Sequence, residues 1–266
     1  MYPRMKIVLM NSSGRKNGNT DRLLKMLGSQ LLHRANEKHL TLEINHVLLS
    51  GETVKSCLGC RSCFDRDVCP LKDDVIKIGE GISDADALIL ASPVYLEDVN
   101  GIMKNWLDRM AYNSHRPAYY KKYAVAITTS GAGASNHSLH TLKRALTAWG
   151  FHVLFTDKFI MGAYMEDERI ESAYISKLSK IAADLIASIQ ADMAQKPTLL
   201  SLISFRIQQK YYRFSKRAGM VDRAYWEKKG WLEPKVNFYT PIRCNPVKLL
   251  FARVLGAFLS RLFIRG

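Results

Sequence analysis

The sequence lacks any apolar run that could cross a bilayer. No stretch reaches the roughly 18 consecutive apolar residues of a spanning helix, and the N-terminus lacks the basic-then-apolar pattern of a secretory signal. These two absences favour a cytoplasmic protein, with attachment to a membrane surface as the alternative to be judged from the rest of the chain.

The sequence also lacks the glycine spacing of two familiar nucleotide-binding loops. A triphosphate loop requires Gly-x4-Gly-Lys-Ser/Thr, but Gly14 and Gly18 are one residue too close and Asn19 stands where the lysine should be. A dinucleotide loop requires three glycines, and this loop has two. What remains is a site for one terminal phosphate, as in a mononucleotide.

The loop itself, residues 10–20, follows the apolar run 5–10 and precedes the amphipathic run 22–32. In a strand–loop–helix unit, backbone N–H groups and the first turn of the helix direct unpaired donors and partial positive charge at one spot. An ordinary polar turn before a capped helix is the alternative. The predicted phosphate-binding residues are Ser12, Ser13, Arg15, Asn17, Gly18, Asn19 and Thr20.

Apolar runs and amphipathic segments alternate along the first part of the chain. The predicted strands are 5–10, 41–49, 86–91, 123–128 and a segment within 151–161. The predicted helices are 20–36, 73–82, 101–112, 137–149 and 167–193. Five strands alternating with five helices predict a doubly wound α/β fold, with a five-stranded parallel sheet in the flavodoxin-like order 2-1-3-4-5.

Ligands of such sheets bind beyond the carboxyl ends of the strands, where the strand order reverses. That rule selects the loops 11–20, 92–100 and 128–136, which all have unusual compositions. Flavin mononucleotide (FMN) fits them: the first loop suits its phosphate, and the other two suit its ring. The predicted ring-binding residues are Pro93, Val94 and Tyr95, which offer a rigid turn and an aromatic face, and Thr129, Ser130, Gly131 and Gly133, which offer hydroxyls and bare backbone.

Four of the five cysteines lie in one short loop, residues 56–70. Cys57, Cys60, Cys63 and Cys69 have the spacing C-x2-C-x2-C-x5-C and are followed by Pro70. Four thiolates on a compact loop can hold an iron–sulfur cluster, and structural zinc fits the same ligands. An empty loop and a thiol–disulfide pair are further alternatives.

The phosphate loop 11–20 resembles that of the NADPH-dependent FMN reductase group, although Gly14 replaces the usual proline. Segments 92–95, 101–104 and 107–109 are also similar to that group, and the cysteine loop resembles the iron–sulfur flavoprotein branch. The resemblance covers residues 5 to about 190 and implies bound FMN, a 4Fe-4S cluster on the four cysteines and redox activity. It further implies a homodimer or homotetramer, with residues 95–109 near a subunit contact.

Acidic residues become scarce after residue 195. Residues 196–266 hold 15 Lys and Arg against 3 Asp and Glu, whereas residues 1–195 hold 24 against 21. We therefore expect an FMN-binding domain over 1–195 and a basic, mainly helical extension over 196–266. In the extension, residues 199–214 read as apolar and aromatic, 219–241 as a loop and 248–264 as a basic amphipathic helix.

That last helix is typical of a membrane-surface or partner-docking element, and packing onto the main domain or onto a second copy is the alternative. Nucleic acid is an unlikely partner, because the extension contains no recognised binding module.

The predicted function is an FMN-dependent oxidoreductase that passes electrons between NAD(P)H or ferredoxin and a flavin, quinone or similar acceptor. Direct transfer to the flavin needs no catalytic acid or base, so no residue is assigned that role, and Asp108 and Arg109 are expected to form a structural ion pair or subunit contact. A flavodoxin-type carrier without turnover, and a flavin reductase with an empty or zinc-filled cysteine loop, are the alternatives.

Overall fold

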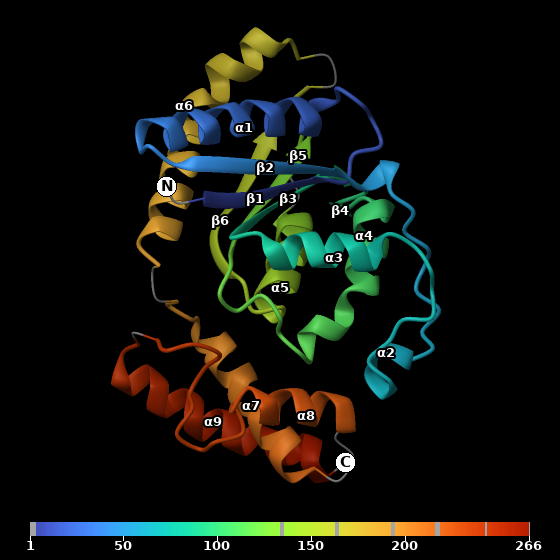
Figure 1. Cartoon of the computed structure of the whole chain (residues 1–266), viewed down its shortest axis with the longest axis vertical. Helices are drawn as coiled ribbons and strands as arrows, with labels where there is room; N and C mark the ends of the chain where they lie inside the picture. The colour runs from blue at the N-terminus through green and yellow to red at the C-terminus, as the bar shows by residue number, and fades with distance from the viewer. Residues whose placement is uncertain are drawn as a thin grey trace.

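The computed structural model describes residues 4–133, 136–162, 165–192, 195–215, 219–242 and 244–265, without the side chains of residues 263 and 265. Its centre is one parallel sheet with helices on both faces (Figure 1). The five long strands are β1 (Arg4–Asn11), β2 (Thr41–Leu48), β3 (Ala87–Tyr95), β5 (Tyr123–Ser130) and β6 (His152–Ile160).

These strands lie in the order β2-β1-β3-β5-β6 and are parallel throughout. Numbered by their own succession, they have the predicted order 2-1-3-4-5. β3 and β5 are buried over almost their whole length, as strands covered on both faces should be. The predicted fold class is therefore confirmed, and the reversal of strand order lies between β1 and β3.

A sixth strand was not predicted. β4 (Asp98–Val99) pairs antiparallel with the end of β3, Val94 opposite Val99, and so forms a small hairpin. Pro93, Val94 and Tyr95 therefore continue the strand instead of forming the expected rigid turn. Proline is tolerated at that strand end because Pro93 is the last residue of β3 in register with β5.

Two layers of helices bury the two faces of the sheet. α1 (Asn19–Glu37) and α6 (Asp167–Gln190) pack on one face, and α3 (Val75–Asp84), α4 (Gly101–Arg109) and α5 (Asn136–Ala148) pack on the other (Figure 1). Short helical turns complete this part: η1 (Leu49–Gly51), α2 (Ser62–Asp65) and η2 (Ala111–Ser114). The two apolar cores lie between the sheet and the helices, so the loops at the carboxyl ends of the strands are not needed for the core and can form a site.

The remaining helices form a separate layer below the sheet (Figure 1). They are α7 (Leu199–Phe214), α8 (Met220–Lys228) and α9 (Pro246–Arg265). Their own apolar cluster centres on Phe205, Trp226 and Trp231. The prediction of one loop over 219–241 was wrong, because α8 occupies its first part: the buried Trp226 gives that segment an apolar anchor.

Candidate functional site: a cofactor cradle beside a four-cysteine pocket

The loop between β1 and α1 is built around buried hydroxyls. Ser12 and Ser13 are buried; the Ser13 amide donates to Asn11 Oδ1 at 2.8 Å, and Ser13 Oγ accepts from the Arg15 amide at 3.2 Å. α1 starts after Gly18 with no side chain capping its first turn. An uncapped helix start beside a short polar loop retains the donors and the partial charge that an anion binds.

The other predicted residues of this loop are arranged less simply. The Asn17 amide donates to Asp21 at 3.0 Å, so that donor is already used. Asn19 Nδ2 donates to the carbonyls of Met161 and Gly162 at 2.9 and 3.1 Å, which turns its amide group toward the end of β6. The exposed Arg15 forms no ion pair with a carboxylate among the described residues. The exposed Arg15 and the uncapped start of α1 are thus better placed for an anion than the Asn19 side chain.

The three predicted loops are joined by direct contacts. Thr20 Oγ1 and Thr129 Oγ1 are 2.7 Å apart, which links the first loop to the end of β5. Asn100 Nδ2 donates to the Ser12 carbonyl at 2.7 Å, which links the first loop to the end of the β3–β4 hairpin. The loops selected from the sequence therefore form one continuous edge of the sheet.

The end of β5 contains buried polar atoms without a partner. Thr128 Oγ1 and Ser130 Oγ are both buried and make no hydrogen bond within the described structure. A Cβ added at Gly131 or Gly133 would meet no atom within 4 Å, so the space beside the backbone is open. Orphaned hydroxyls next to open backbone fit a polar ligand edge, because burying them without a partner is unfavourable.

The β3–β4 hairpin turns on two residues with left-handed backbone, Leu96 at φ 47° and Glu97 at φ 67°. Neither is glycine, so the turn holds backbone strain next to the predicted ring site. Tyr95 is half exposed and Leu96 almost wholly exposed. The predicted aromatic face is therefore available on this hairpin.

The four cysteines of loop 56–70 line one pocket of about 160 Å³. Its remaining walls come from α4 and the residues after it, among them Arg109 and Tyr112. The thiols do not converge: no group of three or more His, Cys, Asp or Glu in the described ranges is arranged to hold a metal ion. Burial raises the pKa of the Cys63 thiol. Four cysteines in one pocket are the donor set of a thiolate-bound centre, and holding one would require the thiols to move toward a common point.

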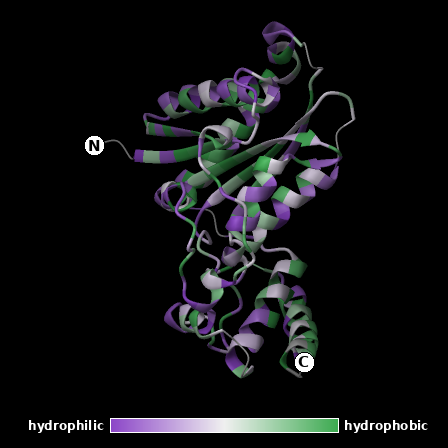
Figure 2. Ribbon diagram, turned by 90° about the vertical axis from the view of Figure 1, so that its right-hand side faces the viewer, coloured by the Kyte–Doolittle hydropathy of each residue, from purple (hydrophilic) through white to green (hydrophobic). Residues whose placement is uncertain are grey.

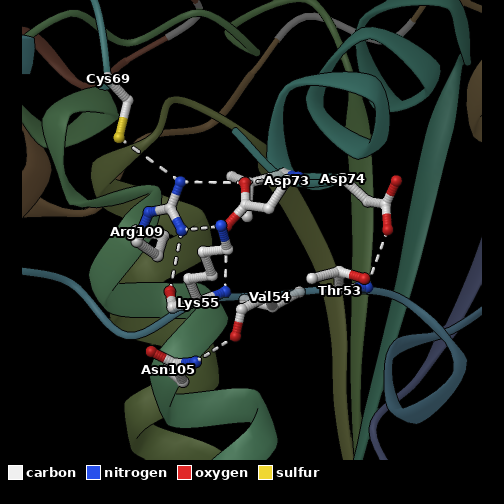
Figure 3. Close-up of polar contacts among 9 residues, drawn as sticks. Thr53, Val54, Lys55, Cys69, Asp73, Asp74, Asn105 and Arg109 are labelled. Atoms are coloured by element: carbon white, nitrogen blue, oxygen red, sulfur yellow. Dashed lines mark hydrogen bonds and ion pairs between the residues drawn. The ribbon is translucent and has the colours of Figure 1, made fainter. Parts of the chain in front are cut away.

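Arg109 of α4 joins the two ends of the cysteine loop (Figure 3). Its guanidinium donates to the Lys55 carbonyl at 2.8 Å, to Cys69 Sγ at 3.4 Å and to Asp73. Both side chains of the Arg109–Asp73 pair are buried. Burial acts to raise the pKa of Asp73, but the Arg109 hydrogen bond and backbone N–H donors outweigh it and lower that pKa. The expected ion pair between Asp108 and Arg109 was wrong: Arg109 pairs with Asp73, and Asp108 pairs with Lys104.

Arg116, after η2, joins the cysteine loop to the C-terminal extension. Its Nη2 donates to the Cys63 carbonyl at 2.7 Å and lies 3.3 Å from Asp67 Oδ1. Its Nη1 lies 3.2 Å from Asp222 Oδ1 of α8, and both side chains are buried. Asp222 also contacts His115 Nδ1 at 2.9 Å. The extension is therefore part of the structure that holds the cysteines.

A wider hollow of about 590 Å³ lies between the segment after β2 and α4. It is lined by Ser50, by Cys57 of the cysteine pocket and by Gly101 at the start of α4. Ser50 Oγ also donates to the Ser13 carbonyl at 3.1 Å. The hollow therefore reaches the cysteine loop, and its lining residue Ser50 contacts the phosphate loop.

Three residues of this region were missed in the sequence: Asn100, Arg116 and Asp222. Asn100 had a local signal, because an Asn before Gly-Ile-Met-Lys is a typical helix N-cap, and its side chain does accept from the Met103 amide. Arg116 and Asp222 are over a hundred positions apart in the chain, and no local pattern pairs them.

Comparison with known proteins agrees with this geometry. The family profile described as NADPH-dependent FMN reductase matches residues 5–166. An iron–sulfur flavoprotein from Archaeoglobus fulgidus is 27% identical over 232 residues, covering 86% of this chain and 100% of that protein. Another iron–sulfur flavoprotein, from Methanosarcina thermophila, is 26% identical over 192 residues, covering 70% of this chain and 97% of that protein.

Among solved structures, a flavone reductase is similar in fold, with a TM-score of 0.52 and 14% identity over 70% of this chain and 63% of its own. Because the family profile spans more than half of the sequence, the chain belongs to the NADPH-dependent FMN reductase family.

Proposed function

We propose that this protein is an FMN-dependent oxidoreductase whose cysteine loop carries an iron–sulfur cluster. It would pass electrons between NAD(P)H or ferredoxin and a flavin, quinone or similar acceptor. The observation that supports this best is an uncapped α1 start and unpartnered hydroxyls of Thr128 and Ser130 at the carboxyl edge of the sheet, with a hollow from Ser50 to Cys57 that leads to a pocket lined by four thiols. The family and the names of the relatives agree with it.

In this proposal the phosphate of FMN binds the backbone N–H groups at the start of α1 and the Arg15 side chain. The ring edge is held by Thr128, Ser130 and the backbone at Gly131 and Gly133, with Tyr95 beside the ring. When bound, FMN supplies the electron chemistry, and the protein's part is to orient it and exclude water. Thr20 and Thr129 fix the distance between the phosphate end and the ring end through their mutual hydrogen bond.

The four cysteines would hold a 4Fe-4S cluster, which exchanges single electrons when bound. Arg109 would position it, because its N–H already points at Cys69 Sγ and such bonds tune a cluster's potential. The 590 Å³ hollow that reaches from Ser50 to Cys57 would leave room between the two centres for a redox partner's surface or a small acceptor.

The test is anaerobic purification followed by an absorption spectrum and by flavin, iron and sulfide analysis. We expect one FMN per chain, with iron that is lost in Cys63→Ser and retained in Cys244→Ser, a matched control outside the loop. Flavin without iron or sulfide would remove the cluster and leave a flavin reductase, and zinc in place of iron would make the loop structural. Absence of flavin would overturn the whole proposal.

Steady-state oxidation of NADH and NADPH, with a quinone or free flavin as acceptor, separates the enzyme from its main alternative. Turnover supports the oxidoreductase. No turnover with either nucleotide, in a preparation that contains flavin, would instead identify a flavodoxin-type carrier.

We also propose that the protein assembles as a homodimer or homotetramer through the region 95–109. The exposed Leu96 at the tip of the hairpin supports this, because an apolar side chain with almost no cover gains from burial against a second subunit. Light scattering coupled to size-exclusion chromatography measures the mass. A monomer at all concentrations would contradict the assembly.

A further inference from the structure

One face of α9 is fixed against α7. Ala252, Gly256 and Ser260 recur every fourth residue along it, and the two with side chains are buried. A Cβ at Gly256 would come within 2.7 Å of Arg206 Cβ and 3.1 Å of the Ile203 carbonyl, so the helices approach as closely as backbone allows. Lys248 Nζ also donates to the Pro197 carbonyl at 2.7 Å, near the start of α7. The inward face of α9 therefore has its partner.

The opposite face of α9 is apolar and bare. Its large side chains recur at helical spacing along one side, and each is more than half exposed: Val247 74%, Leu250 63%, Phe251 53%, Val254 63%, Phe258 60% and Leu262 67%. In Figure 2 the ribbon of α9, which ends at the C label, is mostly in the green of hydrophobic residues. We call these six residues the apolar stripe. A continuous apolar stripe on a surface marks an interaction site.

A cluster of cations lies between α7 and α9 and meets the apolar stripe at Arg261. It consists of Arg206, Lys210 and Arg213 on α7 with Arg253 and Arg261 on α9, and none of them pairs with a carboxylate in the part of the chain that the structure describes. Burial lowers the pKa of Lys210, and the neighbouring charges of Arg206, Arg213 and Arg261 lower it further.

No Asp or Glu occurs after Glu233, so nothing in the last part of the sequence neutralises this cluster. Arg261 itself is exposed and directly precedes Leu262 of the stripe. The cation cluster, through Arg261, and the exposed apolar stripe thus lie next to each other on α9.

This combination decides what the face binds. A second copy of the chain would cover the apolar stripe but would bring two cation clusters together, which is unfavourable. Nucleic acid would satisfy the cations but would leave six apolar side chains in water. An anionic lipid surface satisfies both, because the stripe enters the boundary of the acyl chains while lysine and arginine meet the headgroups.

We propose that α9 docks this protein on the surface of an anionic membrane, lying in the plane of the interface. No helix among the described residues is long and apolar enough to cross a membrane. The oxidoreductase would then exchange electrons with a lipid-soluble acceptor, such as a quinone, or with a membrane-bound partner. Docking itself does not depend on the redox proposal.

The full-length protein is tested by co-sedimentation with vesicles of phosphatidylcholine alone and with added phosphatidylglycerol. We expect binding only to the anionic vesicles, weaker in high salt because surface charges are screened. The double variant Phe251→Ser/Phe258→Ser should bind at least about tenfold more weakly, since two large apolar side chains no longer enter the interface.

The matched control is Leu32→Ser/Ile160→Ser, which changes two apolar residues that are about half exposed on the main domain, 46% and 48%. It should bind like the wild type. Circular dichroism and the thermal midpoint show whether each variant is folded.

Three results would overturn the proposal: no sedimentation of the wild type with anionic vesicles, equal binding to both vesicle types, or equal loss in the control. Sedimentation velocity without lipid adds a fourth. If the Phe251→Ser/Phe258→Ser variant is a smaller species than the wild type, the apolar stripe is a subunit interface instead.

Discussion

At the scale of single residues, the Arg109–Asp73 pair is a buried ion pair beside the cysteines. Both side chains are buried, so each charge has exchanged water for the other and for backbone partners. Lys104 and Asp108, on the same helix, form a comparable pair in water, with about half of each side chain exposed. The two pairs therefore separate the effect of burial from the effect of pairing.

Replacing Arg109 with Met should destabilise the protein by about 3–5 kcal/mol, because the Asp73 charge is then buried without its positive partner. Lys104→Met should cost no more than about 1 kcal/mol, since exposed pairs contribute little. Urea unfolding of the two variants beside the wild type measures both. Similar losses for the two would show that Arg109 is not the stabilising partner of Asp73.

The same pair predicts a pH dependence. The pKa of Asp73 is lowered in the folded protein, so its contribution to stability is fully present above the unfolded pKa of about 3.9. It is lost as the pH falls through the lower folded pKa. The difference in stability between the wild type and Asp73→Asn should therefore shrink as the pH falls below about 4. A difference that stays constant from neutral pH into this range would contradict the assignment.

At the scale of elements, the start of α4 connects two loops of the site, the β3–β4 hairpin and the loop after β1. Asn100 caps the helix by accepting from the Met103 amide and also donates to the buried Ser12 carbonyl. Thr198 caps α7 in the same way, accepting from the Ser201 amide at 3.1 Å, but it lies outside the site. The two caps make the same bond to the helix, but Asn100 is buried and holds a site loop, whereas Thr198 is exposed and does not.

Asn100→Ala and Thr198→Ala should each cost about 1 kcal/mol of stability through the lost cap. Only Asn100→Ala should also weaken FMN binding, by about tenfold for a further loss near 1.4 kcal/mol, because the Ser12 carbonyl loses its donor. Fluorescence titration of the flavin-free protein with FMN measures this. Equal affinity in the two variants would separate Asn100 from the cofactor site.

At the scale of the whole molecule, the C-terminal extension is tied to the cysteine loop. The chain of contacts runs from Asp222 of α8 through Arg116 to the Cys63 carbonyl. Tyr225 and Trp226 of the same helix donate to the carbonyls of Pro117 and His115 at 2.8 and 2.7 Å. A change in the position of α8 would therefore change the contacts that hold the cysteine loop.

Asp222→Asn should loosen the cysteine loop, because it leaves Arg116 with its neutral contact to Cys63 and with only the exposed Asp67 as a charged partner. We expect faster hydrogen exchange over residues 60–69 and a loss of about 1–3 kcal/mol in stability. Glu227→Gln, an exposed change on the same helix, is the control. Unchanged exchange in Asp222→Asn would show that the extension does not position the loop.

The sequence alone determined the order of the sheet and the loops at its carboxyl edge. Alternating apolar and amphipathic segments dictate parallel strands, and parallel strands bring the loops after β1, β3 and β5 together. It also identified the cysteine loop, since clustered thiols are visible as spacing. Local chemistry of this kind can be read along the chain, because the residues that act together are neighbours in it.

Only the tertiary structure decided how those parts are connected. That Arg109 pairs with Asp73, that Asp222 holds Arg116, and that α9 turns its small residues inward and its large ones outward all depend on contacts between distant segments. The apolar surface of α9 is broad, so its sequence alone cannot say which part of that surface is covered. The close packing of Gly256, in α9, against α7 determines which side is covered, and it leaves the apolar stripe exposed to water.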